Sequence, residues 1–313
     1  MLELDLKPTL LWASAGIVLL LFIGTIIIAF LTHRYPHKNW SELRARLRSW
    51  WWMASIFIVA MLIGKFVSLF LFGFLSFLAL KEYLSLIPTR RADRRVLFWA
   101  YLAILVQYYW VGIAWYGVFI IFIPVYMFLF LPIRMILIGE TEGFLKAAGT
   151  LHWGLMTTVF CLSHAAYLLV LPEEVNPIAG GAGLLLFLVF LTEFNDVLQY
   201  IWGQLLGQHK IIPKVSPNKT WEGFLGGLVT TSFTAILLAP WLTPLNLWQA
   251  GLAGFLIATA GFFGDVSISA LKRDLGIKDS GHLLPGHGGI LDRVDSLTYT
   301  APLFFHFVYY LYY

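Results

Sequence analysis

Acidic and basic side chains gather in one polar segment near the end of the chain, residues 265–297. The acids there are Asp265, Asp274, Asp279, Asp292 and Asp295. The bases are Lys272, Arg273, Lys278 and Arg293, with His282 and His287 between them. Carboxylates bind magnesium, and Lys and Arg neutralise phosphate oxygens directly. The mixture of both signs therefore predicts chemistry on phosphate groups, and a solvated loop is the alternative.

The spacing of three acids predicts a cation site. Asp292 and Asp295 are three residues apart, so at the start of a helix both carboxylates project from one face. Asp265 follows a run of small residues, AGFFG, and could meet that pair across a helix interface. We therefore predict that Asp265, Asp292 and Asp295 hold a divalent cation. Simple capping or a salt bridge is the alternative for each of them.

A second polar segment spans residues 199–223 and follows Asp196, which lies just inside an apolar run. An acid at membrane depth is costly unless it is paired or functional. In the run SPNKTWEG, Ser216 or Thr220 could cap the next helix, whose N-terminus would then face a phosphate, with Lys219 beside it. The run is not a Walker motif because the preceding glycine loop is missing. Capping alone is the alternative.

The elements that position these segments are predicted to be membrane helices. With 59% apolar and 12% charged residues, the chain has too little polar surface to cover a soluble globule of 313 residues. The apolar runs lack the period-two alternation of barrel strands. We therefore predict an all-α, polytopic integral membrane bundle of about nine or ten transmembrane helices, the first of them uncleaved. The expected spans lie near residues 10–31, 51–64, 66–80, 96–114, 116–138, 151–171, 178–198, 224–240, 247–264 and 298–313.

The distribution of basic residues predicts the orientation. Lys and Arg cluster within residues 34–48 and 81–95, and cytoplasmic loops carry such an excess. The count of spans then places both polar segments on the cytoplasmic face, where nucleotides are found. Because the cations lie between apolar runs, they indicate topology rather than binding of nucleic acid. The single cysteine, Cys161, excludes an intramolecular disulfide.

Residues 269–295, SALKRDLGIKDSGHLLPGHGGILDRVD, resemble the full signature of phosphatidate cytidylyltransferases, the CDP-diacylglycerol synthases. The upstream pattern of this family is matched by Asp196, by the run KVSPNKTWEG and by Gly226 with Gly227. The resemblance covers roughly residues 190–300, and the first half of the chain matches only in being hydrophobic. It implies N-terminal membrane helices over residues 1–150, which face lipid and the dimer partner, and a catalytic membrane domain over residues 151–313.

The resemblance implies an enzyme of the cytoplasmic (inner) membrane that converts CTP and phosphatidate to CDP-diacylglycerol and pyrophosphate. It also implies magnesium, with or without a second cation, and a homodimer. We predict catalytic roles for Asp265, Lys272, Arg273, His287, Asp292, Arg293 and Asp295. We predict substrate binding by Asp196, Ser216, Lys219, Thr220, Lys278, Gly288 and Gly289.

One stretch departs from the family pattern. After Asp196, where many relatives carry small residues, this chain has the bulkier Val197, Leu198, Gln199 and Tyr200. The departure bears on the lipid substrate more than on the type of reaction. A cytidylyltransferase for another lipid phosphate, such as an ether-linked or isoprenoid one, and a catalytically silent membrane paralogue are therefore the alternatives. A transporter is a further alternative, against which the one-sided clustering of charge argues.

Overall fold

The structure is a computed structural model that describes residues 7–37, 39–90, 93–281 and 288–313. Every regular element in these ranges is a helix, and an isolated β-bridge joins Lys210 and Thr220. The elements are α1 (Pro8–Arg34), α2 (Ser41–Ile63), α3 (Lys65–Leu86), α4 (Arg94–Gly112), α5 (Tyr116–Ile121), η2 (Phe122–Met127), α6 (Phe128–Ile136), α7 (Phe144–Leu155), η3 (Met156–Cys161), α8 (Leu162–Tyr167), η4 (Leu168–Val170), α9 (Gly180–Leu206), α10 (Trp221–Leu242), α11 (Leu247–Asp274) and α12 (Leu291–Tyr312).

The predicted class, an all-α polytopic membrane bundle, is confirmed. Eight continuous helical segments in the described ranges are long and apolar enough to cross a membrane. The predicted spans near residues 96–114 and 298–313 are also helices, α4 and α12, but they fall outside this group of eight. The adjoining runs near residues 51–64 and 66–80 form two separate helices, α2 and α3. They meet at Gly64, whose φ of 137° is a value that side chains disfavour.

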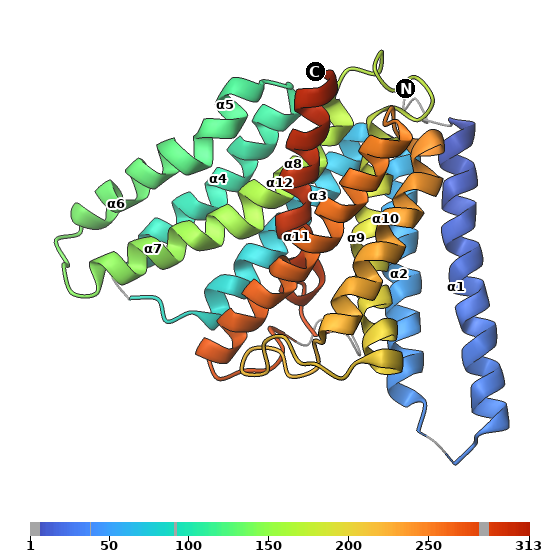
Figure 1. The fold of residues 1–313 in the computed structure, drawn as a ribbon. Helices are drawn as coiled ribbons and strands as arrows, with labels where there is room; N and C mark the ends of the chain where they lie inside the picture. The colour runs from blue at the N-terminus through green and yellow to red at the C-terminus, as the bar shows by residue number, and fades with distance from the viewer. Residues whose placement is uncertain (1–6, 38, 91–92, 282–287) are drawn as a thin grey trace.

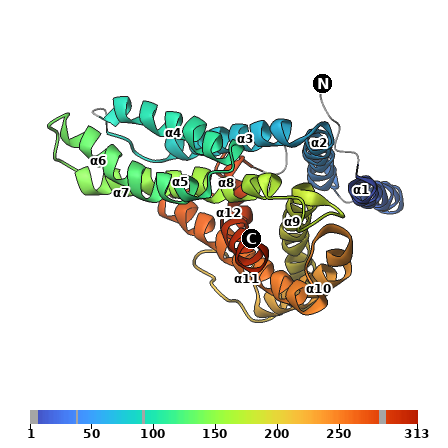
Figure 2. The ribbon, with the colours of Figure 1, turned by 90° about the horizontal axis from the view of Figure 1, so that it is seen from above.

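The helices are arranged so that the polar connections share one end of the bundle. Figure 1 shows the α1–α2, α9–α10 and α11–α12 connections at the lower end, with the start of α1 and the C-terminus at the upper end. Seen from above, α9 to α12 gather on one side of the rows formed by α2 to α8 (Figure 2). The division of the chain at residue 150 stays a prediction, and this residue lies within α7.

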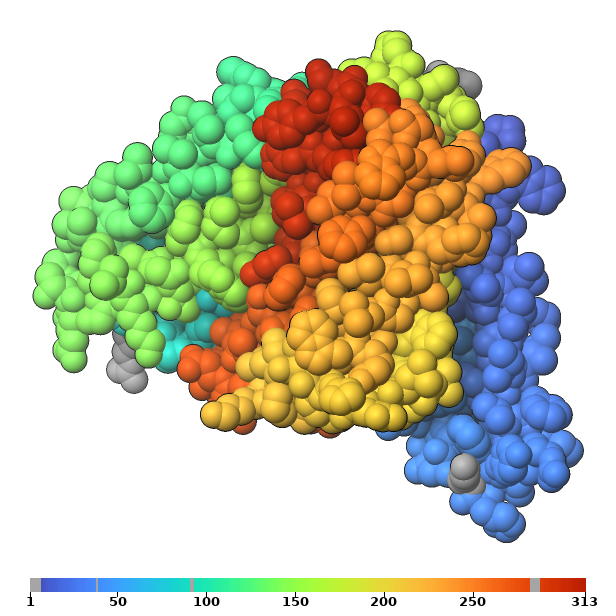
Figure 3. All heavy atoms as spheres, in the orientation of Figure 1, coloured from blue at the N-terminus to red at the C-terminus, as the bar shows by residue number. Residues whose placement is uncertain are grey.

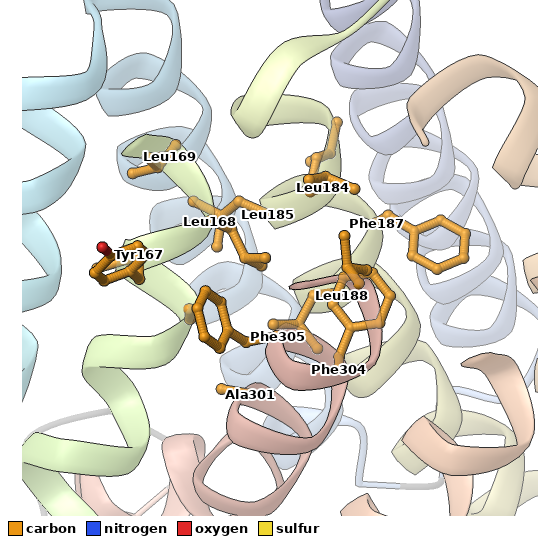
Figure 4. Close-up of a cluster of buried hydrophobic side chains, with 14 of the residues drawn as sticks. Tyr167, Leu168, Leu169, Leu184, Leu185, Phe187, Leu188, Ala301, Phe304 and Phe305 are labelled. Atoms are coloured by element: carbon orange, nitrogen blue, oxygen red, sulfur yellow. The ribbon is translucent and has the colours of Figure 1, made fainter. Parts of the chain in front are cut away.

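A large part of the hydrophobic core lies where α8 and η4, α9 and α12 meet. Figure 4 shows Leu168, Leu185 and Phe305 pointing into this cluster from the three sides. Close backbone approach holds α9 against its neighbours, because a Cβ on Gly181 would lie 2.2 Å from the carbonyl oxygen of Leu168. Membrane helices pack through such small residues, since lipid supplies no hydrophobic force between them. The core therefore fixes α9 and α12, the helices that carry Asp196 and Asp295.

Replacement of Gly181 by alanine should destabilise the bundle, because the added methyl meets backbone atoms that cannot rotate away. We expect a loss of about 1–3 kcal/mol, the usual cost of overpacking. Gly16→Ala is the matched control, because a Cβ there has no atom within 4 Å. Thermal unfolding of the purified protein in detergent measures both variants. Equal melting temperatures for the two would contradict this account of the α9 contact.

Candidate active site

A buried cluster of charge lies where α9, α11, α12 and the α9–α10 connection meet. Lys219, in that connection, places its Nζ 2.6 Å from Oδ2 of Asp265 on α11. Ser269, one turn further along α11, donates a hydrogen bond of 3.1 Å to the other oxygen of Asp265. The Lys219 ammonium also lies 4.9 Å from the ring centre of Phe262, within the range of a cation–π contact. One lysine thus compensates a carboxylate that is only 28% exposed.

The charge state of Lys219 is set by its neighbours. Burial lowers the pKa of this ammonium, but the carboxylates of Asp265 and Asp196 outweigh burial and raise the pKa above its ordinary value. The side chain is therefore a permanent cation at neutral pH. A fixed positive charge can form strong hydrogen bonds with a phosphate as well as with a carboxylate.

Three carboxylates from three helices interact within this cluster. Asp295 on α12 interacts electrostatically with Asp265 and with Asp196 on α9. One oxygen of Asp196 accepts a hydrogen bond of 2.8 Å from the Ser296 hydroxyl. Its other oxygen, Oδ1, is buried with no hydrogen-bond partner in the described part of the chain. The three carboxylates lie at the end of the bundle that carries the α9–α10 and α11–α12 connections.

Backbone contact between α11 and α12 explains why Asp265 and Asp295 meet. A Cβ on Gly264 would lie 2.4 Å from the carbonyl oxygen of Asp295, so only glycine permits this approach. α12 begins at Leu291, which places Asp292 in its first turn as the DRVD spacing predicts. The small residues before Asp265 therefore do what the sequence suggested, because they let the two helices touch.

Asp292 has different partners from Asp295. Its Oδ1 lies 2.7 Å from the Lys272 ammonium. Its Oδ2 accepts hydrogen bonds from the backbone of Ser280 (2.8 Å) and Gly289 (3.1 Å) and from the Ser280 hydroxyl (2.9 Å). With 5% of its surface exposed, Asp292 is fully engaged by protein groups. The acid placed near Asp265 and Asp295 by the structure is Asp196, which the sequence assigned to substrate binding.

The carboxylates of this cluster are oxygen donors of the type that magnesium binds. Among the described residues, no group of three or more His, Cys, Asp or Glu side chains is arranged to hold a metal ion by itself. Magnesium, however, keeps several waters and is usually bound through one or two carboxylates together with substrate phosphates. The unpartnered Oδ1 of Asp196, beside the carboxylates of Asp265 and Asp295, offers such a partial site. The metal role of Asp265, Asp292 and Asp295 stays a prediction.

A cavity of about 210 Å³ opens beside this cluster. Its lining includes five predicted site residues, namely Asp196, Ser216, Lys219, Thr220 and Asp265. No binding role was predicted for the other large groups around it, which are Gln199, Tyr200, Asn218, Phe224 and Phe262. A larger hollow, of about 880 Å³, lies between α1 and α2, whose connected ends protrude in Figure 3. That hollow shares no lining residue with the acidic cluster.

Local hydrogen bonds shape the α9–α10 connection. Thr220 is the N-cap of α10, and its hydroxyl accepts a hydrogen bond of 3.2 Å from the backbone of Gly223, as predicted. The bridge between Lys210 and Thr220 closes the base of the connection. The Lys219 backbone N–H donates to the carbonyl of Ser216, at 3.3 Å, in a tight turn. These contacts place Lys219 directly before the helix, where its side chain reaches Asp265.

Of the remaining predicted residues, Arg273, Lys278, Gly288 and Arg293 lie in the described ranges. Arg273 donates to the backbone of Val215 at 3.1 Å, which joins the end of α11 to the α9–α10 connection. Lys278 is exposed. Gly288 takes a φ of 80°, and His287 lies outside the described residues. Arg293 interacts electrostatically with Glu193 and Asp295.

Two acids near the site escaped the sequence reasoning. Glu193 lies one turn before Asp196 on α9 and interacts with Arg293 and Asp295. Its signal was available, because it is a second acid inside an apolar span. Glu82 on α3 accepts hydrogen bonds from the segment that precedes α12. It gave no separate signal, since it lies among basic residues that indicate topology.

Replacement of Lys219 by methionine should destabilise the protein, because it leaves the buried Asp265 without its cation. Breaking a buried ion pair costs about 3–5 kcal/mol, and exposed pairs contribute about 0–1 kcal/mol. For side chains that are 15% and 28% exposed we expect a loss between these limits, about 2 kcal/mol. Denaturant titration in detergent measures it. Lys214→Met, an exposed lysine in the same connection, is the control and should change stability little. A similar effect of both substitutions would contradict the role of the ion pair.

Comparison with known proteins adds independent information. A family model described as "Cytidylyltransferase family" matches residues 44–311. A protein of Escherichia coli (strain K12) named "Uncharacterized protein YnbB" is 46% identical over 296 residues, which cover 95% of this chain and 97% of that protein. Two proteins named "Phosphatidate cytidylyltransferase" are similar over shorter ranges. The one from Mycobacterium leprae is 43% identical over 44% of this chain and 42% of its own length. The one from Staphylococcus haemolyticus is 38% identical over 49% of this chain and 59% of its own length.

Proposed function

We propose, on the premise that this chain belongs to the cytidylyltransferase family, that it transfers the cytidylyl group of CTP to the lipid phosphate phosphatidate. The products are CDP-diacylglycerol and pyrophosphate, and the site faces the cytoplasm from the inner membrane. The observation that supports this proposal most is the cluster of Asp196, Asp265 and Asp295 with Lys219, beside a cavity at one end of a membrane bundle. The choice of phosphatidate is supported by the names of the two relatives whose match covers about half of their own length.

The proposed reaction is an in-line displacement at phosphorus. An oxygen of the lipid phosphate attacks the α-phosphorus of CTP and forms a new P–O bond. The bond from that phosphorus to the oxygen it shares with the β-phosphorus breaks, and pyrophosphate leaves with this electron pair. A phosphate monoester is largely ionised near neutral pH, so no strong base is needed. The barrier that protein groups can lower is the repulsion between two polyanions.

Cationic side chains of the protein would reduce much of that repulsion. Lys219 lines the cavity, and Lys272 and Arg273 follow at the end of α11. Arg293, in the first turn of α12, interacts electrostatically with Glu193 and Asp295. We propose that these four side chains neutralise the triphosphate and the lipid phosphate, and that His287 positions substrate.

One or two of the carboxylates of Asp196, Asp265 and Asp295 would bind magnesium together with substrate phosphates, and Asp292 would orient Lys272 beside them. When bound, magnesium neutralises phosphate oxygens and aligns the leaving group. A homodimer, implied by the family resemblance, stays a prediction.

A second candidate acceptor is a different lipid phosphate. Gln199 and Tyr200 line the cavity directly after Asp196 on α9, and a Cβ on Gly227 would lie 2.4 Å from Cγ of Gln199. The bulk of these side chains therefore helps to set the shape of the cavity and the packing of α9 on α10. Radiolabelled CTP offered with a panel of lipid phosphates, scored for a CDP-lipid product, separates the two acceptors. A purified protein that releases no pyrophosphate with any of them would refute cytidylyl transfer.

Asp295→Asn should lower kcat by about 10²-fold or more, because it removes a negative charge that is proposed to bind the cation in a buried site. The substitution keeps the size of the side chain. Asp274→Asn, at the exposed end of α11, is the matched control and should retain most of the activity. Pyrophosphate release by the purified variants measures both. Wild-type turnover in Asp295→Asn would remove this residue from the proposed site.

Activity should require a divalent cation. We expect that a chelator abolishes CDP-lipid formation and that added magnesium restores it, because partial carboxylate sites share the ion with substrate phosphates. Titration of magnesium into chelated enzyme, with product measured at each step, tests this. Full turnover in excess chelator would exclude the cation site.

A further inference from the structure

Glu82 lies near the end of α3, far along the chain from the polar segment that carries the signature. Its Oε2 accepts a hydrogen bond of 2.9 Å from the backbone of Ile290, and its Oε1 accepts one of 3.0 Å from that of Leu291. The Ser280 hydroxyl, which also lies near Asp292, is within hydrogen-bond distance of Oε1 as well. We propose that Glu82 is a positioning residue that holds the start of α12, and with it Asp292 and Asp295, in place for the reaction. This inference rests on the proposed function only for its effect on turnover.

The start of α12 needs such a partner. The first N–H groups of a helix have no acceptor within the helix itself. Ile290, the N-cap residue of α12, supplies no side-chain acceptor. The carboxylate of Glu82 replaces that cap from another helix, and a negative charge at a helix N-terminus is also favoured by the helix dipole. The position of α12 along its axis therefore depends on α3.

Two carboxylates share the same partner. Ser280 Oγ contacts Glu82 and also lies 2.9 Å from Oδ2 of Asp292. The backbone N–H groups of Ser280 and Gly289 donate to Asp292 as well. Because Asp292 in turn binds the Lys272 ammonium at 2.7 Å, α3, α11 and α12 are joined through one chain of contacts. A shift of Glu82 would displace the groups on which Lys272 depends.

Glycines make room for this carboxylate. A Cβ on Gly289 would lie 2.0 Å from Oε1 of Glu82, and a Cβ on Gly281 would lie 3.0 Å from Oε2. Gly289 was assigned to substrate binding from the sequence. The close approach of Glu82 is a second reason for glycine at this position, and this reason does not depend on a bound ligand. It also shows that the contact is built into the segment on both sides of residues 282–287, which lie outside the described ranges.

Glu82→Gln tests the proposal, because it keeps the size of the side chain but turns one acceptor oxygen into a donor that faces other donors. We expect kcat to fall about tenfold or more, as for a misplaced catalytic group, while KM for CTP changes little. We also expect faster amide hydrogen exchange in the peptide that contains Ile290 and Leu291, with exchange in α9 and α10 unchanged. The full-length protein is labelled with deuterium in detergent for timed periods and then digested. Mass spectrometry of the peptides measures the exchange.

Glu42→Gln is the matched control. Glu42 is an exposed glutamate on α2 that pairs with Arg46 within its own helix, and it should leave both kcat and exchange unchanged. Ser280→Ala is the milder second variant in case Glu82→Gln does not accumulate. It removes the contacts of the Ser280 hydroxyl with Glu82 and Asp292 but keeps the carboxylate of Glu82. It should raise exchange in the same peptide by a smaller factor.

The outcomes decide the inference separately from the proposed function. Unchanged exchange at Ile290 and Leu291 in both Glu82→Gln and Ser280→Ala would overturn it, and so would an increase spread evenly over all helices. A local increase with wild-type kcat would overturn the link to turnover. If the wild-type protein forms no CDP-lipid, the proposed function fails, and the exchange measurement still decides whether Glu82 holds α12.

Discussion

The ion pair between Lys219 and Asp265 is the interaction on which the site depends. Asp196, Asp265 and Asp295 come from three helices and interact with one another, so without a cation they would repel and resist burial. Lys219 is brought to them by a connection that folds back through the Lys210–Thr220 bridge. Helix packing, loop closure and charge compensation are therefore one constraint, and none of them can be satisfied without the others.

Small residues let the helices come close enough for that constraint to be met. Gly264 allows α11 to touch α12 beside Asp295, and a Cβ on Gly223 would lie 2.8 Å from the backbone oxygen of Gln199, where α10 meets α9. Membrane helices gain their association from close packing rather than from the hydrophobic effect. The contacts that stabilise the bundle here are the contacts that place the acids. A change in packing at these glycines would therefore also displace the acids of the site.

The sequence could predict features that depend on local pattern. Apolar runs of bilayer length specify helices, DRVD specifies the start of α12, and Thr220 specifies a cap. Pattern cannot say which helices face each other. Asp292 and Asp295 have the spacing of a pair, yet Asp292 is held by Lys272 and Ser280 while Asp295 interacts with Asp196. Glu82 contacts residues about 200 positions away, a distance that only tertiary structure bridges.

The contact of Glu82 with α12 changes how the N-terminal half is understood. The sequence assigned residues 1–150 to lipid contact and dimerisation, and the residues predicted to carry the chemistry all lay between Asp196 and Asp295. The family match, however, begins at residue 44 and so includes α3. Because the start of α12 has no side-chain cap of its own, the signature segment relies on Glu82 of α3 to accept the backbone N–H groups of Ile290 and Leu291. We infer that the two halves form one functional unit, in which α3 supplies the rigid support for the carboxylates and α9 to α12 supply the charges.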